Sequence, residues 1–150
     1  LLSGSAGGLV VGGALVHDPD KFGAAVCLVG ELNPIRLLHA RNGANQIGEM
    51  GDPRKASDFP WMLAMDPYQQ ITPHTAYPAV LLAVGLNDNR VSTWQTGKFA
   101  ARLRSADTSG RPVWIRTDAN GGHGMQTSLG AEAAQFADIY AFLCAQSPAQ

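Results

Sequence analysis

The 150-residue sequence is short of charge, of cysteine and of long hydrophobic runs. Charged residues make up 15 % of the chain, against roughly 25 % in an average protein. With 45 % apolar residues the chain has a core to bury, which argues against disorder. Eleven basic and twelve acidic residues form no basic stripe, so we expect neither nucleic acid nor an anionic membrane as a partner. Apolar stretches such as Ala79–Gly85 fall far below the ~18 residues that a membrane helix needs.

The two cysteines, Cys27 and Cys144, lie far apart and outside any CxxC pair. Both have apolar neighbours, so we expect two small buried hydrophobes and no disulfide framework, metal or cofactor. The N-terminus lacks the basic and apolar regions of a signal peptide, which leaves the compartment open between cytoplasm and periplasm. Because the chain has no starting Met and begins with residues typical of a strand, we expect a fragment.

Apolar runs separated by turn residues predict alternating strands and helices. Strands are expected at 22–29, 79–85 and 112–117, with a fourth ending at 1–3, and helices at 8–16, near 34–40, around 57–65, at 93–106 and at 128–145. Uniformly apolar strands alternating with helices favour an α/β fold whose parallel sheet is covered on both faces. Sheets average ~5–6 strands, so we expect residues 1–150 to be part of a domain with about half of its sheet.

A turn of small residues, Ser3–Gly8, follows the first strand and leads directly into a helix. The nucleophile elbow G-x-S-x-G has this form, because a serine on a strained turn needs tiny neighbours. Ser5 would be the nucleophile, and the N–H of Ala6 at the helix start could receive an oxyanion. The alternative is a glycine-rich turn that packs closely or binds phosphate, although the spacing does not fit a Rossmann motif or a P-loop.

Two further polar loops each follow an apolar strand. Asp88 could orient a histidine, although Asn-Asp-Asn also forms simple turns. His123 lies among glycines, with the access that a general base needs. The order Ser5, Asp88, His123, each after its own strand, is that of α/β-hydrolases and favours a catalytic triad. The three other histidines are expected on the surface or in loops: His17, His39 and His74.

These residues resemble the C-terminal part of the catalytic domain of the prolyl oligopeptidase family of serine peptidases. The matching motifs run from end to end of the chain: Gly4–Gly12, Pro19–Ala24, Asp66–Tyr68, Tyr77–Ala79, Asp88–Val91, Gly122–Gly124 and Asp138–Leu143. The resemblance implies an α/β-hydrolase-type parallel sheet with helices on both faces, of which this chain supplies the C-terminal half. It also implies that earlier strands, a tyrosine of the oxyanion hole and a β-propeller lie outside these residues.

The resemblance implies a role for each matching residue. Ser5 would be the nucleophile, His123 the general base and then acid, Asp88 the residue that orients it, and the Ala6 N–H one oxyanion donor. Arg90 matches a position whose guanidinium holds a backbone carbonyl of the substrate, with a salt bridge within the loop as the alternative. Val91, which completes the Asp-x-Arg-Val motif, is expected among the substrate-binding residues.

Two positions depart from the proline-specific members of the family. A tryptophan that stacks on the substrate proline is replaced by Gln46, and a neighbouring apolar pocket position is replaced by Glu31. A carboxylate would favour a cationic group over a proline ring, because an unpaired charge in a closed pocket is costly. Glu31 could instead point to water. Because Gln46 and Glu31 both depart from the proline-specific pattern, strict prolyl specificity is not expected.

The leading hypothesis is a serine peptidase that cleaves oligopeptides through an acyl-enzyme. One alternative is a carboxylesterase, since fold and triad do not determine the acyl group. Another is a non-catalytic fragment without a complete oxyanion hole. A half sheet exposes an apolar edge and apolar faces, which predicts a homo-oligomer or association with a missing N-terminal segment.

Overall fold

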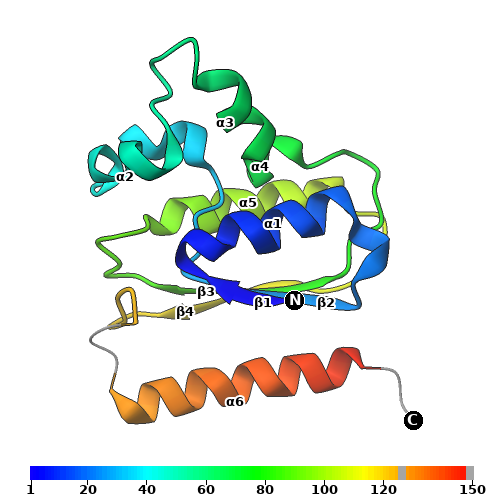
Figure 1. Ribbon diagram of the computed structural model, residues 1–150. Helices are drawn as coiled ribbons and strands as arrows, with labels where there is room; N and C mark the ends of the chain where they lie inside the picture. The colour runs from blue at the N-terminus through cyan, green and yellow to red at the C-terminus, as the bar shows by residue number, and fades with distance from the viewer. Residues whose placement is uncertain (125–127, 148–150) are drawn as a thin grey trace.

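A parallel β-sheet forms the centre of the computed structural model, which describes residues 1–124 and 128–147 (Figure 1). Its strands are β1 (Leu2–Gly4), β2 (Ala24–Leu28), β3 (Ala79–Gly85) and β4 (Val113–Asp118). They lie in the order β1-β2-β3-β4, and every neighbouring pair is parallel. The four predicted strands are confirmed. Because each is parallel to the next, all four end at the same edge of the sheet.

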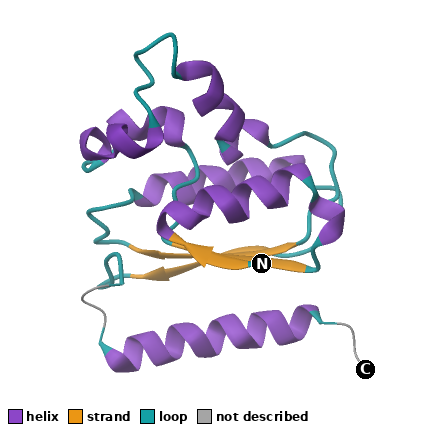
Figure 2. Ribbon diagram, in the orientation of Figure 1, coloured by secondary structure: helices purple, strands orange, loops and turns teal. Residues whose placement is uncertain are grey.

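Helices cover both faces of this sheet, as its uniformly apolar strands predict. Helices α1 (Gly8–His17) and α5 (Thr93–Ala106) lie on one face, and α6 (Leu129–Gln146) lies on the other (Figures 1 and 2). Successive residues of β2 point to opposite faces, since Ala25 and Cys27 pack with the α1 and α5 side while Val26 packs with α6. Both faces of a strand therefore need apolar residues.

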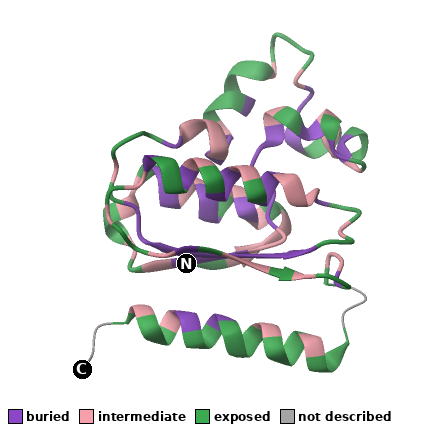
Figure 3. Cartoon of the chain, turned by 180° about the vertical axis from the view of Figure 1, so that it is seen from behind, coloured by how far each residue is buried: buried purple, intermediate pink, exposed green. Residues whose placement is uncertain are grey.

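The two faces are unequally covered. The core beneath α1 and α5 contains large side chains with almost no exposure, among them Leu15, Phe99 and Leu103. The core beneath α6 is smaller, and much of α6 is exposed (Figure 3). Sequence periodicity places Phe136 and Tyr140 on the apolar side of this helix, yet they are 36 % and 60 % exposed. Periodicity identifies the apolar side of a helix but not how much of it is covered.

The connection from β2 to β3 contains more helix than its sequence predicts. It comprises a 3-10 helix (Pro34–His39), α2 (Gly43–Met50), α3 (Phe59–Met65) and α4 (Pro67–Gln70). The first was expected as a helix and is a 3-10 turn, and α2 and α4 were not predicted. Two glycines lower the helix propensity of α2. Gly43 is nevertheless required, because a Cβ there would lie 1.7 Å from the carbonyl oxygen of Leu37.

The two cysteines lie in different environments. Cys27 is buried in β2 as predicted, and burial raises the pKa of its thiol to about 12. Cys144 is exposed, so the expectation that it is buried was wrong. It belongs to the incompletely covered helix α6, whose apolar neighbours in sequence do not enclose it.

Candidate active site

Ser5 occupies a strained turn at the carboxyl end of β1. Its φ is +54°, in the left-handed region that non-glycine residues seldom adopt. The neighbouring glycines leave no room for side chains. A Cβ at Gly4 would lie 2.5 Å from the carbonyl oxygen of Leu28, and one at Gly7 would lie 2.0 Å from Ser3 Oγ. The turn therefore has the geometry of a nucleophile elbow, which presents the serine hydroxyl above the sheet edge.

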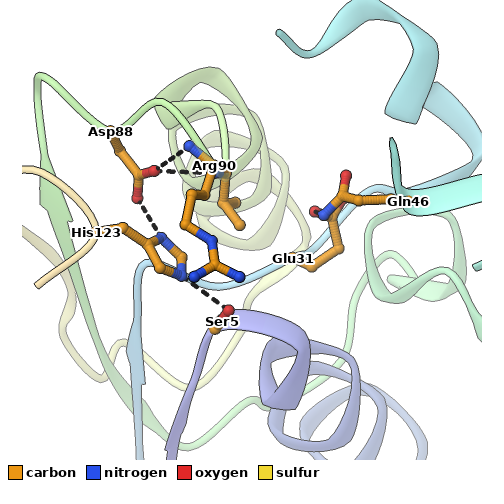
Figure 4. Close-up of polar contacts among 7 residues, drawn as sticks. Ser5, Glu31, Gln46, Asp88, Arg90 and His123 are labelled. Atoms are coloured by element: carbon orange, nitrogen blue, oxygen red, sulfur yellow. Dashed lines mark hydrogen bonds and ion pairs between the residues drawn. The ribbon is translucent and has the colours of Figure 1, made fainter. Parts of the chain in front are cut away.

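His123 links Ser5 to Asp88 in one hydrogen-bonded chain (Figure 4). Its Nε2 lies 2.8 Å from Ser5 Oγ, and its Nδ1 lies 2.8 Å from Asp88 Oδ2. Because an ionised carboxylate can only accept, Nδ1 carries the proton and Nε2 accepts from the serine hydroxyl. The three residues follow β1, β3 and β4, whose carboxyl ends lie at the same edge of the sheet. The structure thus brings together three residues up to 118 positions apart.

Backbone donors hold the carboxylate of Asp88 in place. Its side chain is 1 % exposed, and its Oδ1 accepts the N–H groups of Arg90 at 2.8 Å and Val91 at 2.9 Å. The other oxygen is then left to face His123. Val91 was expected among the substrate-binding residues, but its side chain is buried and its N–H supports Asp88.

The loops that carry Asp88 and His123 are bonded to each other. The N–H of Asn87 donates to the carbonyl of Gly121 at 2.9 Å. Gly85, the last residue of β3, lies beneath the same loop, where a Cβ would be 2.5 Å from the Gly121 oxygen. The position of His123 relative to Asp88 therefore depends on close backbone packing as well as on the hydrogen bond between them.

Ala6 and Arg90 lie beside this chain of residues. Ala6 is exposed in the 3-10 turn Ser5–Gly7, so its N–H belongs to the first-turn donors that have no partner within a helix. The guanidinium of Arg90 extends toward Ser5 and His123 (Figure 4). Both groups therefore lie next to Ser5.

Glu31 is buried beside the elbow and does not point to water. It is 1 % exposed, and its N–H donates to the carbonyl of Ser5 at 2.9 Å. Its Oε1 accepts from Gln95 Nε2 at 2.5 Å and its Oε2 accepts from Gln46 Nε2 at 3.3 Å. Burial raises the pKa of the Glu31 carboxyl, and the two amide hydrogen bonds offset only part of this effect. Gln95 was not predicted, because no motif in the sequence relates it to Glu31.

The three other histidines are not part of this hydrogen-bonded chain. His17, His39 and His74 are exposed, as expected. Within residues 1–124 and 128–147 no three His, Cys, Asp or Glu side chains are grouped so as to hold a metal ion. No helix in that part of the chain is long and apolar enough to cross a membrane.

A cavity of about 200 Å³ adjoins His123, lined by Val29 and Phe136 among others.

Comparison with known proteins gives one family. The model of the prolyl oligopeptidase family matches residues 2–149. Dipeptidyl aminopeptidase BI of Pseudoxanthomonas mexicana is 30 % identical over 148 residues, which are 97 % of this chain and 20 % of that protein. Oligopeptidase B from Leishmania major superposes with a TM-score of 0.91 at 25 % identity, covering 97 % of this chain and 20 % of that one.

A structure from an analysis of two prolyl endopeptidases gives a TM-score of 0.90 at 33 % identity, over 95 % of this chain and 21 % of that one. The chain thus spans about a fifth of the length of the relatives that it matches. Its four parallel strands and their helices correspond to the α/β-hydrolase fold of prolyl oligopeptidase catalytic domains. The chain belongs to the prolyl oligopeptidase family, whose members are serine peptidases.

Proposed function

We propose that this chain supplies the catalytic triad of a serine peptidase that cleaves oligopeptides through an acyl-enzyme. The observation that carries the proposal is the continuous chain Ser5 Oγ–His123–Asp88, with both hydrogen bonds at 2.8 Å. Ser5 attacks the peptide carbonyl while its proton passes to His123 Nε2, and Asp88 stabilises the imidazolium. His123 then gives the proton to the leaving amine. Water activated by His123 hydrolyses the ester that remains.

Charge on the tetrahedral intermediate needs fixed donors. The N–H of Ala6 supplies one donor, because Ala6 follows the nucleophile directly in the 3-10 turn Ser5–Gly7. The family resemblance implies a second donor, a tyrosine hydroxyl from another segment of the protein. Arg90 is proposed to hold a backbone carbonyl of the peptide, since its guanidinium extends toward Ser5 (Figure 4).

We also propose that residues 1–150 are part of a larger catalytic domain, completed at the β1 edge by another segment. β1 is an edge strand, and Leu2 within it and Val10 on α1 are 49 % and 71 % exposed. An exposed edge offers unpaired backbone groups to a further strand. A homo-oligomer is the alternative occupant. Size-exclusion chromatography of the natural full-length protein separates the two, because completion within one polypeptide gives a monomer.

Labelling with a fluorophosphonate probe tests the triad. The natural protein should be labelled. The control variant Ser3→Ala should be labelled too, because it makes the same substitution two residues away from the nucleophile. Ser5→Ala should not be labelled, and its rate should fall by about 10⁶-fold. Labelling of Ser5→Ala would assign the nucleophile elsewhere.

The same preparation distinguishes the alternative functions. Hydrolysis of a p-nitrophenyl ester without hydrolysis of peptide anilides would favour a carboxylesterase. A folded protein that is not labelled would favour a non-catalytic role, since loss of one oxyanion donor alone costs ~10²–10³-fold in rate.

A further inference from the structure

Positive charge gathers where the 3-10 helix that follows β2 meets α5 (Figure 1). Arg36 and His39 of the 3-10 helix and Lys98 of α5 line one cavity of about 360 Å³, together with Trp94. Within residues 1–124 and 128–147, no carboxylate lines this cavity, and neither Arg36 nor Lys98 takes part in an ion pair. Both charges can therefore meet an anion that comes from outside these residues.

The ammonium of Lys98 is held in one position. Its Nζ donates to Asn33 Oδ1 at 2.9 Å and lies 4.4 Å from the centre of the Tyr68 ring and 5.2 Å from that of Trp94. Asn33 is 0 % exposed, and its Nδ2 donates to Asp66 Oδ2 at 2.8 Å, so its oxygen is the atom that faces the lysine. An ammonium has three N–H donors, and the bond to Asn33 uses one of them. The lysine can therefore bind an anion without leaving its place.

A second cation on α5 increases the positive charge. The guanidinium carbon of Arg102 lies 4.8 Å from the centre of the Tyr68 ring, so Arg102 and Lys98 share one ring. Arg102 donates to Gln69 Oε1 at 3.5 Å and belongs to none of the ion pairs among the described residues. Like charges four positions apart on a helix repel each other and destabilise it. A bound anion would relieve this repulsion.

One carboxyl, Asp66, is connected to Lys98 through Asn33, but it is committed to other donors. It is 0 % exposed and does not line the cavity. Its Oδ2 accepts from Asn33 Nδ2 and from the N–H of Ile35 at 3.1 Å, and its Oδ1 accepts the N–H of Gln69 at 3.0 Å. Burial also raises the pKa of Asp66, which disfavours its charged form. The cavity thus keeps an excess of positive charge.

Trp94 connects this cavity to the loop that carries Asp88. It also lines a second cavity of about 490 Å³, beside Asp88 and Asn89. Arg41 lines the second cavity as well and donates to Asn89 Oδ1 at 3.2 Å. A half-buried indole offers a flat apolar surface to the hydrocarbon part of a ligand. The cations and the ring together suit a carboxylate group on an organic chain that reaches the active-site loop.

We propose that Arg36, Lys98 and Trp94 form a binding site for a carboxylate of the peptide substrate, away from the bond that is cleaved. The planar guanidinium matches a carboxylate through two parallel N–H donors, and the fixed ammonium adds a third. The proposal rests on the peptidase function proposed above. It assigns the substrate class as oligopeptides that carry an acidic side chain or a free C-terminus at a distance from the cleaved bond.

Paired peptides test this carboxylate site on the natural full-length protein. In one set of internally quenched oligopeptides, a single Glu is moved along a neutral sequence and compared with Gln at the same position. In a second set, a free C-terminus is compared with a C-terminal amide. We expect the carboxylate to lower KM by about fivefold in one set and to leave kcat unchanged, because the contact does not involve the reacting atoms. The set that responds identifies which carboxylate binds. Raising the salt from about 0.01 M to about 1 M should weaken the effect, because salt screens exposed charges.

Arg36→Gln and Lys98→Gln should each bring the two KM values of a responding pair closer together. KM for the neutral peptide should stay the same. Neither variant is expected to disturb the fold, because Arg36 is exposed and a glutamine at 98 keeps a donor for Asn33 Oδ1. The control is Arg111→Gln, which removes an exposed positive charge before β4, at the opposite edge of the sheet from the triad. Arg111→Gln should leave both KM values unchanged, and an equal loss in this control would overturn the site in favour of net charge.

Binding without cleavage keeps the site separate from the chemistry. In the full-length Ser5→Ala protein, calorimetric titration with the responding peptide should detect binding that Arg36→Gln weakens. Equal KM values within every pair, or a difference that persists in both Arg36→Gln and Lys98→Gln, would overturn the site. Binding of inorganic phosphate but not of the peptide would overturn it as well. A protein that the fluorophosphonate probe labels but that shows equal KM values contradicts the carboxylate site alone, whereas an unlabelled protein contradicts the peptidase function on which it rests.

Discussion

Two buried carboxyl groups flank Ser5, and the structure holds them in different ways. Asp88 is bound by two backbone N–H groups and by His123, whereas Glu31 is bound by the side-chain amides of Gln46 and Gln95. Backbone donors cannot move without a change of the loop, but side-chain amides can rotate. The contrast is between one carboxylate held by the backbone of its own loop and one held by side chains from two other elements.

The largest expected effect comes from replacing Asp88, the carboxyl that backbone donors hold. Asp88→Asn should lower kcat by about 10⁴-fold, because an amide no longer enforces the required histidine tautomer. Glu31→Gln should leave kcat for a peptide anilide within about threefold, since neither proton transfer nor the oxyanion involves it. Steady-state kinetics on that one substrate measures both variants. Equal losses in the two variants would show that the carboxyl groups do not have separate roles.

The second prediction concerns the loop packing that places His123 against Asp88, and it replaces no triad residue. In Gly85→Ala the new Cβ would lie 2.4 Å from the carbonyl oxygen of Gly122, so the loop carrying His123 must shift. We expect kcat to fall by about 10²-fold, the cost of a misplacement of about 1 Å. Gly97→Ala on α5 is the matched control, because nothing lies within 4 Å of its new Cβ. Full activity in both variants would contradict the proposed dependence on loop packing.

The smallest expected effect is on the free energy of unfolding, and it concerns Glu31. Burial raises the folded pKa of Glu31 above the ordinary glutamate value of about 4.5. The contribution of this group to stability is therefore complete below pH 4.5 and is lost as the pH rises through the folded pKa. We expect Glu31→Gln to be more stable than the natural protein at pH 8, because the amide has no charge to bury. Urea unfolding at pH 8 and pH 4 measures the difference, which should shrink at the lower pH.

The positions of the candidate triad could be predicted because they depend on features local to the sequence. Each of Ser5, Asp88 and His123 follows an apolar strand, and the small residues around Ser5 match a strained turn. Parallel strands end at the same edge of a sheet, so three loops separated in sequence meet there. The order of the residues along the chain then indicates which side chains interact.

The surroundings of Glu31 could not be predicted in the same way. Glu31 and Gln95 are 64 positions apart, and no motif marks either residue as the partner of the other. Helix α2, which carries Gln46, contains two glycines and is formed by packing against its neighbours rather than by propensity. The buried N–H role of Val91 and the exposure of Cys144 likewise depend on contacts that the local sequence does not encode.

The sequence by itself determined the parallel sheet, the strained turn at Ser5 and the chain order of the triad residues. These features follow from apolar periodicity and from steric limits on a few small residues, and both act over short distances. Only the tertiary structure decided which carboxyl has backbone donors and which has side-chain amides, and how much of α6 is covered. Those outcomes depend on where distant segments come into contact, and burial then sets the cost of each charge.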